Sequence, residues 1–286
     1  MKSFRMVLLT CVNNFRKWGH SYRIICIAII LLLLSHMFTS ELRLVVMDTG
    51  IKITPWIFPF LCKGGYVKLL FLFPILLLFC DAPFIDHNQQ YIIIRMGRVK
   101  WCFSQLLYIV ISSAIYFAYI IFISIVVNIQ YIKYDPDWGK ILYTMAGTDA
   151  ASQYGLKYNI SQEIIDYFTP MQAMLFSFFL SWMVGIFLGL LIFMMNAIMD
   201  IHNIGIFMAS AFLLLDMAKG NITNGEKIIW LSPVSWNNLT NIRLGNNQSL
   251  PSFNWVIGIL VAVYVCFIIV SVIGFRKKTI NVLEYM

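Results

Sequence analysis

Residues 24–34 read IICIAIILLLL, an unbroken apolar run inside a longer apolar stretch from about residue 22 to residue 40. A helix that crosses the hydrocarbon core of a bilayer needs ~20 mostly apolar residues, and this stretch supplies them. Runs of this kind do not alternate between apolar and polar residues, as the strands of an outer-membrane β-barrel would. The sequence therefore predicts an all-α membrane protein.

The composition of the whole chain agrees with this prediction. Of 286 residues, 60% are hydrophobic and only 21 basic and 13 acidic residues are available to cover a surface, with a mean hydropathy of +0.79. Such values are typical of a helical protein that crosses the membrane several times. The six cysteines form no CxxC pair, so neither a disulfide framework nor a zinc site is indicated.

Six transmembrane spans are expected, with a charged residue at the end of two of them. Two proline-containing fragments, residues 54–62 and 228–236, are too short to cross and are expected to be re-entrant or interfacial. Lys68 and Asp216 lie at ends of spans, so we expect both at the membrane interface rather than in ion coupling. The approximate bounds of the spans are 22–40, 66–80, 103–130, 171–195, 201–217 and 255–275.

Basic residues give the chain an orientation. They cluster beside span ends on the side that would hold both termini, and this clustering places both termini in the cytoplasm of a multi-pass cell-membrane protein. Residues 1–21 are expected to form an interfacial helix, with a solvated basic tail as the alternative. Residues 131–170 then form an outer loop, either a small cap or a variable loop. Residues 218–254 form an outer region with re-entrant helices.

A basic insert, residues 81–102, separates spans two and three. Pro83 ends the second span, and a helix from Gln89 to Trp101 would place Arg95 and Arg98 on one stripe. Gly97 costs a helix ~1 kcal/mol relative to alanine, which indicates close packing or a bend there. Two interpretations stay open: the insert docks a partner, or its charges only anchor span three.

Catalytic motifs are missing from the sequence. It contains no GxxxxGK[ST] phosphate loop, no HExxH and no GxSxG. We therefore expect a chain that is not an enzyme, with no catalytic residues, no metal ligands and no cofactor of its own. The nearly charge-free spans also argue against transport driven by an ion gradient.

The order of these elements resembles the permease subunits of ABC-type exporters of the second superfamily, the relatives of polysaccharide, peptide and drug exporters. Residues 91–105, with Arg95, Gly97, Arg98 and Trp101, resemble the coupling helix of that family, and residues 231–236 resemble its segment before span six. The chain departs from the pattern at Gln89 and Gln90, where relatives often have an acidic residue.

The resemblance implies that residues 1–286 form one permease domain. This domain would work with a second permease subunit, identical or homologous, and with two ATPase subunits that bind ATP and Mg. The substrate would be an amphipathic peptide, lipid or drug, and nucleic acid is not an expected partner. The implied ATPase-docking residues are Arg95, Gly97, Arg98 and Trp101. The implied substrate-cavity residues, for which ordinary packing is the alternative, are Phe176, Phe179, Met183 and Phe187. The alternative function is a non-transporting immunity or sensor protein without an ATPase partner.

Overall fold

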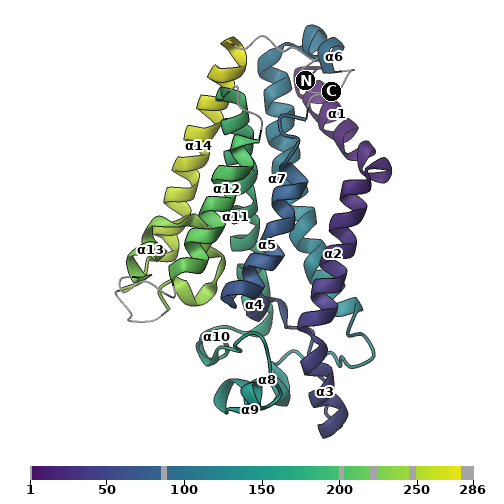
Figure 1. Ribbon diagram of the computed structural model, residues 1–286, viewed down its shortest axis with the longest axis vertical. Coiled ribbons are helices and arrows are strands. Elements are labelled where there is room, and N and C mark those ends of the chain that lie inside the picture. The colour runs from purple at the N-terminus through teal and green to yellow at the C-terminus, as the bar shows by residue number, and fades with distance from the viewer. Residues whose placement is uncertain (1, 85–88, 200–202, 220–224, 245–248, 278–286) are drawn as a thin grey trace.

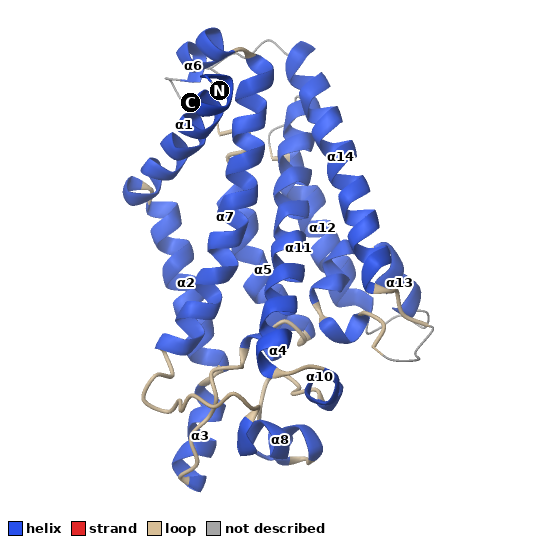
Figure 2. Cartoon of the chain, turned by 180° about the vertical axis from the view of Figure 1, so that it is seen from behind, coloured by secondary structure: helices blue, strands red, loops and turns tan. Residues whose placement is uncertain are grey.

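The computed structural model describes residues 2–84, 89–199, 203–219, 225–244 and 249–277. Helices dominate it, and loops gather at its two ends (Figure 2). Within these ranges no residue belongs to a strand, and Ile53 and Ile132 form an isolated bridge. The predicted all-α class is therefore confirmed.

The first half of the chain leads from an N-terminal helix to a long one in the bundle. Its elements are α1 (Lys2–Arg16), the 3-10 turn η1 (Lys17–His20), α2 (Tyr22–Phe38), α3 (Ser40–Thr49), α4 (Phe58–Leu61), α5 (Gly65–Phe79), α6 (Gln89–Met96) and α7 (Arg98–Val126). Only Thr39 separates α2 from α3, so α3 continues the course of α2.

The second half begins with three short helices and ends with a long one. Its elements are α8 (Gly139–Gly147), α9 (Ala150–Gln153), α10 (Gln162–Tyr167), α11 (Pro170–Ile198), α12 (Ile204–Ala218), α13 (Gly225–Leu231), the 3-10 turns η3 (Pro233–Asn237) and η4 (Leu239–Asn241), and α14 (Phe253–Lys277). Thr169 and Gln172 form a capping box that starts α11, with Pro170 at the first helical position.

Membrane-crossing length divides the apolar helices into two groups. Among the described residues, four stretches are long and apolar enough to cross a bilayer: Tyr22–Thr49, Arg98–Val126, Pro170–Ile198 and Phe253–Arg276. The apolar helices α5 and α12 have 15 residues each and are therefore only ~22 Å long, less than the ~30 Å hydrocarbon core. Four of the six predicted spans thus correspond to helices of crossing length, and the other two correspond to shorter helices.

The apolar helices lie side by side, and the elements outside them gather at two ends (Figure 1). We call the end with α1 and α6 the α6 end, and the end with α3, α8 and α9 the α3 end. Helix α11 contacts α5, α7, α12 and α14 and is the most buried of the four long stretches. It therefore forms the centre of the bundle.

The loop over residues 131–170 is a packed cap at the α3 end. Ile53 pairs with this loop, since its amide donates to the Tyr131 carbonyl at 3.0 Å. The Thr54 hydroxyl donates to the Trp138 carbonyl at 2.8 Å, and Trp138 itself is buried. Tyr158 is buried in the cap, and this burial raises the pKa of its phenol. Of the two sequence interpretations, the structure supports the cap.

The crossing of α11 and α12 is close because Gly205 has no side chain. A Cβ at this position would lie 2.6 Å from the carbonyl oxygen of Ile192, which belongs to the α11 backbone and cannot rotate away. The Gly205 amide also donates to Asn196 Oδ1 at 3.0 Å. The start of α12 is thereby fixed against the end of α11.

We expect Gly205→Ala to lower the stability of the protein by about 1–3 kcal/mol, because the added methyl overpacks this crossing. Thermal unfolding in detergent measures the effect. Gly258→Ala is the matched control, since a Cβ there would meet nothing within 4 Å and alanine favours a helix. Equal unfolding temperatures for the two variants would contradict the packing described here.

Candidate functional site

The insert between α5 and α7 is the first candidate site, described except for residues 85–88. Its helix is divided: α6 ends at Met96 and α7 begins at Arg98, with Gly97 between them at a φ of +86°, a conformation that favours glycine. The expectation of one continuous helix to Trp101 was wrong. Of the two alternatives for Gly97, the bend is confirmed. The other alternative, close packing, does not hold, because a Cβ there would meet nothing within 4 Å.

Helix α1 holds α6 and α7 together at this end. The Thr10 hydroxyl donates a hydrogen bond to the sulfur of Met96, the last residue of α6, at 3.4 Å. One turn further along α1, the Asn14 amide donates to Gln105 Oε1 of α7 at 2.7 Å, and both side chains are buried. The insert is therefore attached to the body through buried contacts.

The opposite side of α6 lies on the surface. Tyr91 is 75% exposed and Ile94 is 83% exposed, and Arg95 and Arg98 are exposed beside them. We call the surface formed by these four residues the α6 face. An aromatic ring, an aliphatic side chain and two guanidinium groups together suit contact with a protein surface that offers apolar and acidic groups.

The sequence-predicted docking residues divide between surface and core. Arg95, Gly97 and Arg98 are exposed, whereas Trp101 is 0% exposed and packs edge-to-face on Phe275 of α14 with ring centroids 5.2 Å apart. Arg98 Nη1 donates to the Arg276 carbonyl at 3.0 Å. Trp101 thus connects the start of α7 to the end of α14, and its ring is not presented to a partner.

The predicted substrate-cavity residues lie along α11 and pack against its neighbours. Phe187 is buried between Phe212 of α12 and Phe267 of α14, at ring distances of 5.4 and 5.8 Å. Met183 is buried, and its carbonyl accepts a hydrogen bond from the Tyr264 hydroxyl at 2.5 Å.

The other two predicted cavity residues have aromatic neighbours. Phe176 lies 5.6 Å from Phe168 and from Phe253, and Phe179 lies 6.3 Å from Trp182. In this conformation the four side chains join the helices, and their role in a cavity stays a prediction.

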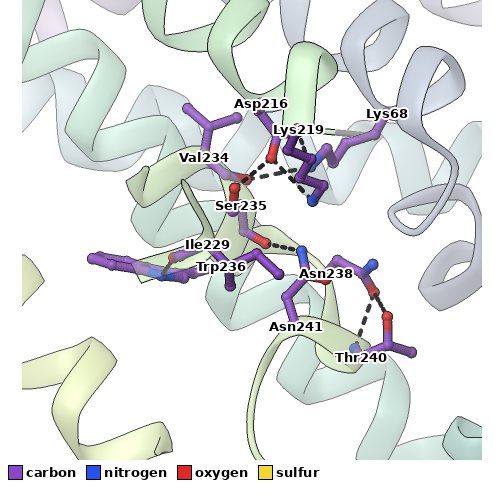
Figure 3. Close-up of polar contacts among 10 residues, drawn as sticks. All are labelled: Lys68, Asp216, Lys219, Ile229, Val234, Ser235, Trp236, Asn238, Thr240 and Asn241. Carbon is purple, nitrogen blue, oxygen red and sulfur yellow. Dashed lines mark hydrogen bonds and ion pairs between the residues drawn. The ribbon is translucent and has the colours of Figure 1, made fainter. Parts of the chain in front are cut away.

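A buried ion pair near the α3 end is the site that sequence reasoning missed. Lys68 in the first turn of α5 pairs with Asp216 in the last turn of α12, and the side chains are 2% and 3% exposed (Figure 3). The sequence suggested interfacial side chains, and the structure instead buries both of them inside the protein. The signal in the sequence was that two residues of opposite charge lie at the ends of two unusually short apolar stretches.

Asp216 is the centre of a wider network in Figure 3. Its carboxylate accepts a hydrogen bond from the Ser235 hydroxyl of η3 at 2.5 Å and from Lys219 Nζ at 3.2 Å. Lys68 Nζ also donates to the Val234 carbonyl at 3.5 Å. The turn η3 is thus held to α5 and α12 at once.

A second polar chain and a small cavity adjoin this network. The Ser181 hydroxyl of α11 donates to Asn237 Oδ1 of η3, and it lies 3.6 Å from the Cys62 sulfur beside α4. Cys62, Lys68 and Asn237 line a cavity with room for about one water molecule. Its other walls are apolar, so Lys68 and these neighbours supply its polar character.

No family model, no curated protein and no solved structure matches this chain.

We expect Trp101→Ala to lower the free energy of unfolding by about 3–5 kcal/mol, because it leaves a cavity between α7 and α14. Denaturant or thermal unfolding in detergent measures the loss. Ile94→Ala is the control, since truncation of an exposed side chain changes stability by no more than about 0.5 kcal/mol. A Trp101→Ala protein as stable as the Ile94→Ala protein would contradict the burial of Trp101.

Proposed function

We propose that this chain is the transmembrane permease subunit of an ABC exporter. It would work with a second permease subunit and with two ATPase subunits that bind ATP and Mg. The observation that carries the proposal is the α6 face: a short surface helix at one end of an apolar bundle, with exposed apolar and basic side chains. Apolar and basic side chains exposed together on a short helix at one end of the bundle support an interaction site there.

The attachments of the insert support a role in transmitting motion. A displacement of α6 would reach α1 through the Thr10 contact with Met96. Arg98 and Trp101 stand in the first turn of α7, beyond the bend at Gly97, and they join α7 to α14 through the Arg276 carbonyl and Phe275. A push on α6 would therefore act on α1 directly and on α14 by way of α7.

Helix α1 supports the proposed membrane placement. Its inner side, with Cys11 and Asn14, is buried, while Phe4, Leu9 and Val12 are exposed. A helix with an exposed apolar side and basic residues is suited to the headgroup plane. The α6 end would then be cytoplasmic, where the basic insert obeys the positive-inside rule.

In the proposed topology α5 and α12 are the second and fifth of six spans. Each is too short to cross alone, and each adjoins a proline-containing segment with buried residues at the α3 end. Helix α4 precedes α5, and η3, which follows α13, is bonded to α12 through Ser235 and Asp216. Irregular backbone at membrane depth is tolerated where protein surrounds it. The short helices and these segments would together span the bilayer.

The substrate class is an amphipathic peptide, lipid or drug. A cavity between two permease subunits would take it up on one side and release it on the other, with the aromatic and methionine side chains of α11 as candidate contacts. The cell membrane is the proposed location.

The docking proposal predicts that Ile94→Ala and Arg95→Lys each reduce co-purification of the ATPase about tenfold. Ile94→Ala removes an apolar contact, and a lysine keeps the charge but cannot rebuild a bidentate contact with a carboxylate. Lys140→Ala, an exposed basic residue of α8, is the control and should change nothing.

The outcome of that experiment also decides between the open interpretations. Full ATPase recovery with both variants would leave the insert as an anchor of α7. Failure to recover any nucleotide-binding partner with the unaltered protein would favour the non-transporting immunity or sensor protein.

The proposed six-span topology predicts the sidedness of two positions that depend on the short helices. Lys100→Cys should be labelled by an impermeant thiol reagent only from the cytoplasm, which requires α5 to cross. Lys227→Cys should be labelled only from outside, which requires α12 to cross. Asn159→Cys in the cap gives the outside reference, and all three positions are exposed. Labelling of Lys100→Cys from outside would exclude α5 as a span.

A further inference from the structure

The position of the Lys68 and Asp216 pair in the bundle is unusual for charged groups. Helix α5 rises only ~17 Å from Lys68 to its end at Phe79, so the pair lies well inside a ~30 Å hydrocarbon core if α5 is a span. Both side chains are almost completely buried. Charges at such depth are costly and are a sign of function.

Stability alone gives no reason for this pair. Taking two charges out of water carries a desolvation cost, and well-packed apolar residues of similar size often serve as well or better. An ion pair adds specificity, and each charged group can exchange its partner for another one nearby. Such an exchange requires a second polar group within reach of Asp216 or Lys68.

Asp216 has such a group in Lys219. Lys219 Nζ lies 3.2 Å from Asp216 Oδ1 on the same helix, while Lys68 binds Oδ2 from a different helix. The Lys219 side chain is 23% exposed and thus reaches toward the surface. If α5 moved away from α12, the Asp216 carboxylate would keep a cationic partner.

Lys68 has one further acceptor besides the carboxylate. Its ammonium group carries three N–H donors, and its acceptors are Asp216 and the Val234 carbonyl. The cavity lined in part by Cys62, Lys68 and Asn237 is at the lower size limit for one water molecule, and its lining is almost entirely apolar. A released ammonium group would therefore keep the Val234 carbonyl, and it would regain further hydrogen bonds only when this region opens to water.

We infer that Lys68, Asp216 and Lys219 form an exchangeable ion-pair latch that closes the α3 end of the bundle. In the closed state described here, Asp216 binds Lys68 and joins α5 to α12 and η3. In the open state, Asp216 keeps Lys219 as its cationic partner, and α4 with the Lys68 end of α5 moves away from α12 and α11, so that Cys62 loses its contact with Ser181 and is exposed. This inference does not rest on the ATPase partner, because the latch lies within one chain.

The experiment measures the rate at which N-ethylmaleimide, a small neutral reagent, alkylates each native cysteine of the full-length protein in membranes. Peptide mass spectrometry quantifies the alkylation of Cys62, beside the latch, and of Cys102, at the α6 end, separately. Both are buried, so each reacts only when its surroundings open. Cys102 is therefore the internal control for general loosening.

We expect Lys68→Met to raise the rate at Cys62 about tenfold, because the residue that joins α5 to Asp216 is lost. Lys219→Met gives the sharper result. It leaves the closed pair intact and removes the partner of the open state, so the rate at Cys62 should fall below that of the unaltered protein. Cys102 should react at an unchanged rate in both variants.

A static salt bridge would give the opposite result for Lys219→Met, since the loss of a supporting charge would loosen the site. A rate at Cys62 that rises or stays the same in Lys219→Met therefore overturns the inference. So does a parallel rise at Cys62 and Cys102 in Lys68→Met. Lys219 is partly exposed, so its replacement decides the matter even where Lys68→Met fails to fold.

Discussion

The contact between Lys68 and Asp216 is the interaction on which the α3 end of this structure depends. It holds the first turn of α5 to the last turn of α12, and it binds η3 to both through Ser235 and Val234. An uncompensated buried charge costs far more than a pair, and each partner has a second polar group within reach, Lys219 for Asp216 and the Val234 carbonyl for Lys68. The polar network at this end therefore follows from the requirement that each charge in it has a partner.

The two ends of the bundle are built on different principles. At the α3 end, polar groups meet inside the protein, and the surface is a packed cap of short helices. At the α6 end, the interior holds aromatic packing, as in Trp101 with Phe275, and a neutral hydrogen bond between Asn14 and Gln105, while Arg95 and Arg98 are exposed. An end with charges outside suits a partner in water, whereas an end with charges inside suits an internal rearrangement.

The sequence predicted the all-α class and the long helices, because a long apolar run identifies a membrane helix without any tertiary information. It also located the bend at Gly97 and the proline-containing segments, which are local signals. It missed the burial of Lys68, Asp216 and Trp101 for a common reason. The burial of each depends on a residue far away in the chain, and hydropathy treats a charge at a helix end as an interfacial one. Only the fold brings α5 beside α12 and α7 beside α14.

Helix α5 reaches from the ion pair toward the α6 end, and its two halves are held differently. A Cβ at Gly185 would meet the Ile75 side chain at 3.0 Å, and one at Gly189 would meet the Phe79 ring at 2.9 Å, so residues 75–79 lie close against α11. Pro74 stands between these residues and Lys68, and a proline inside a helix removes a backbone hydrogen bond and permits a bend. A movement of the Lys68 end of α5 would therefore be taken up at Pro74, while the Phe79 end keeps its contacts with α11.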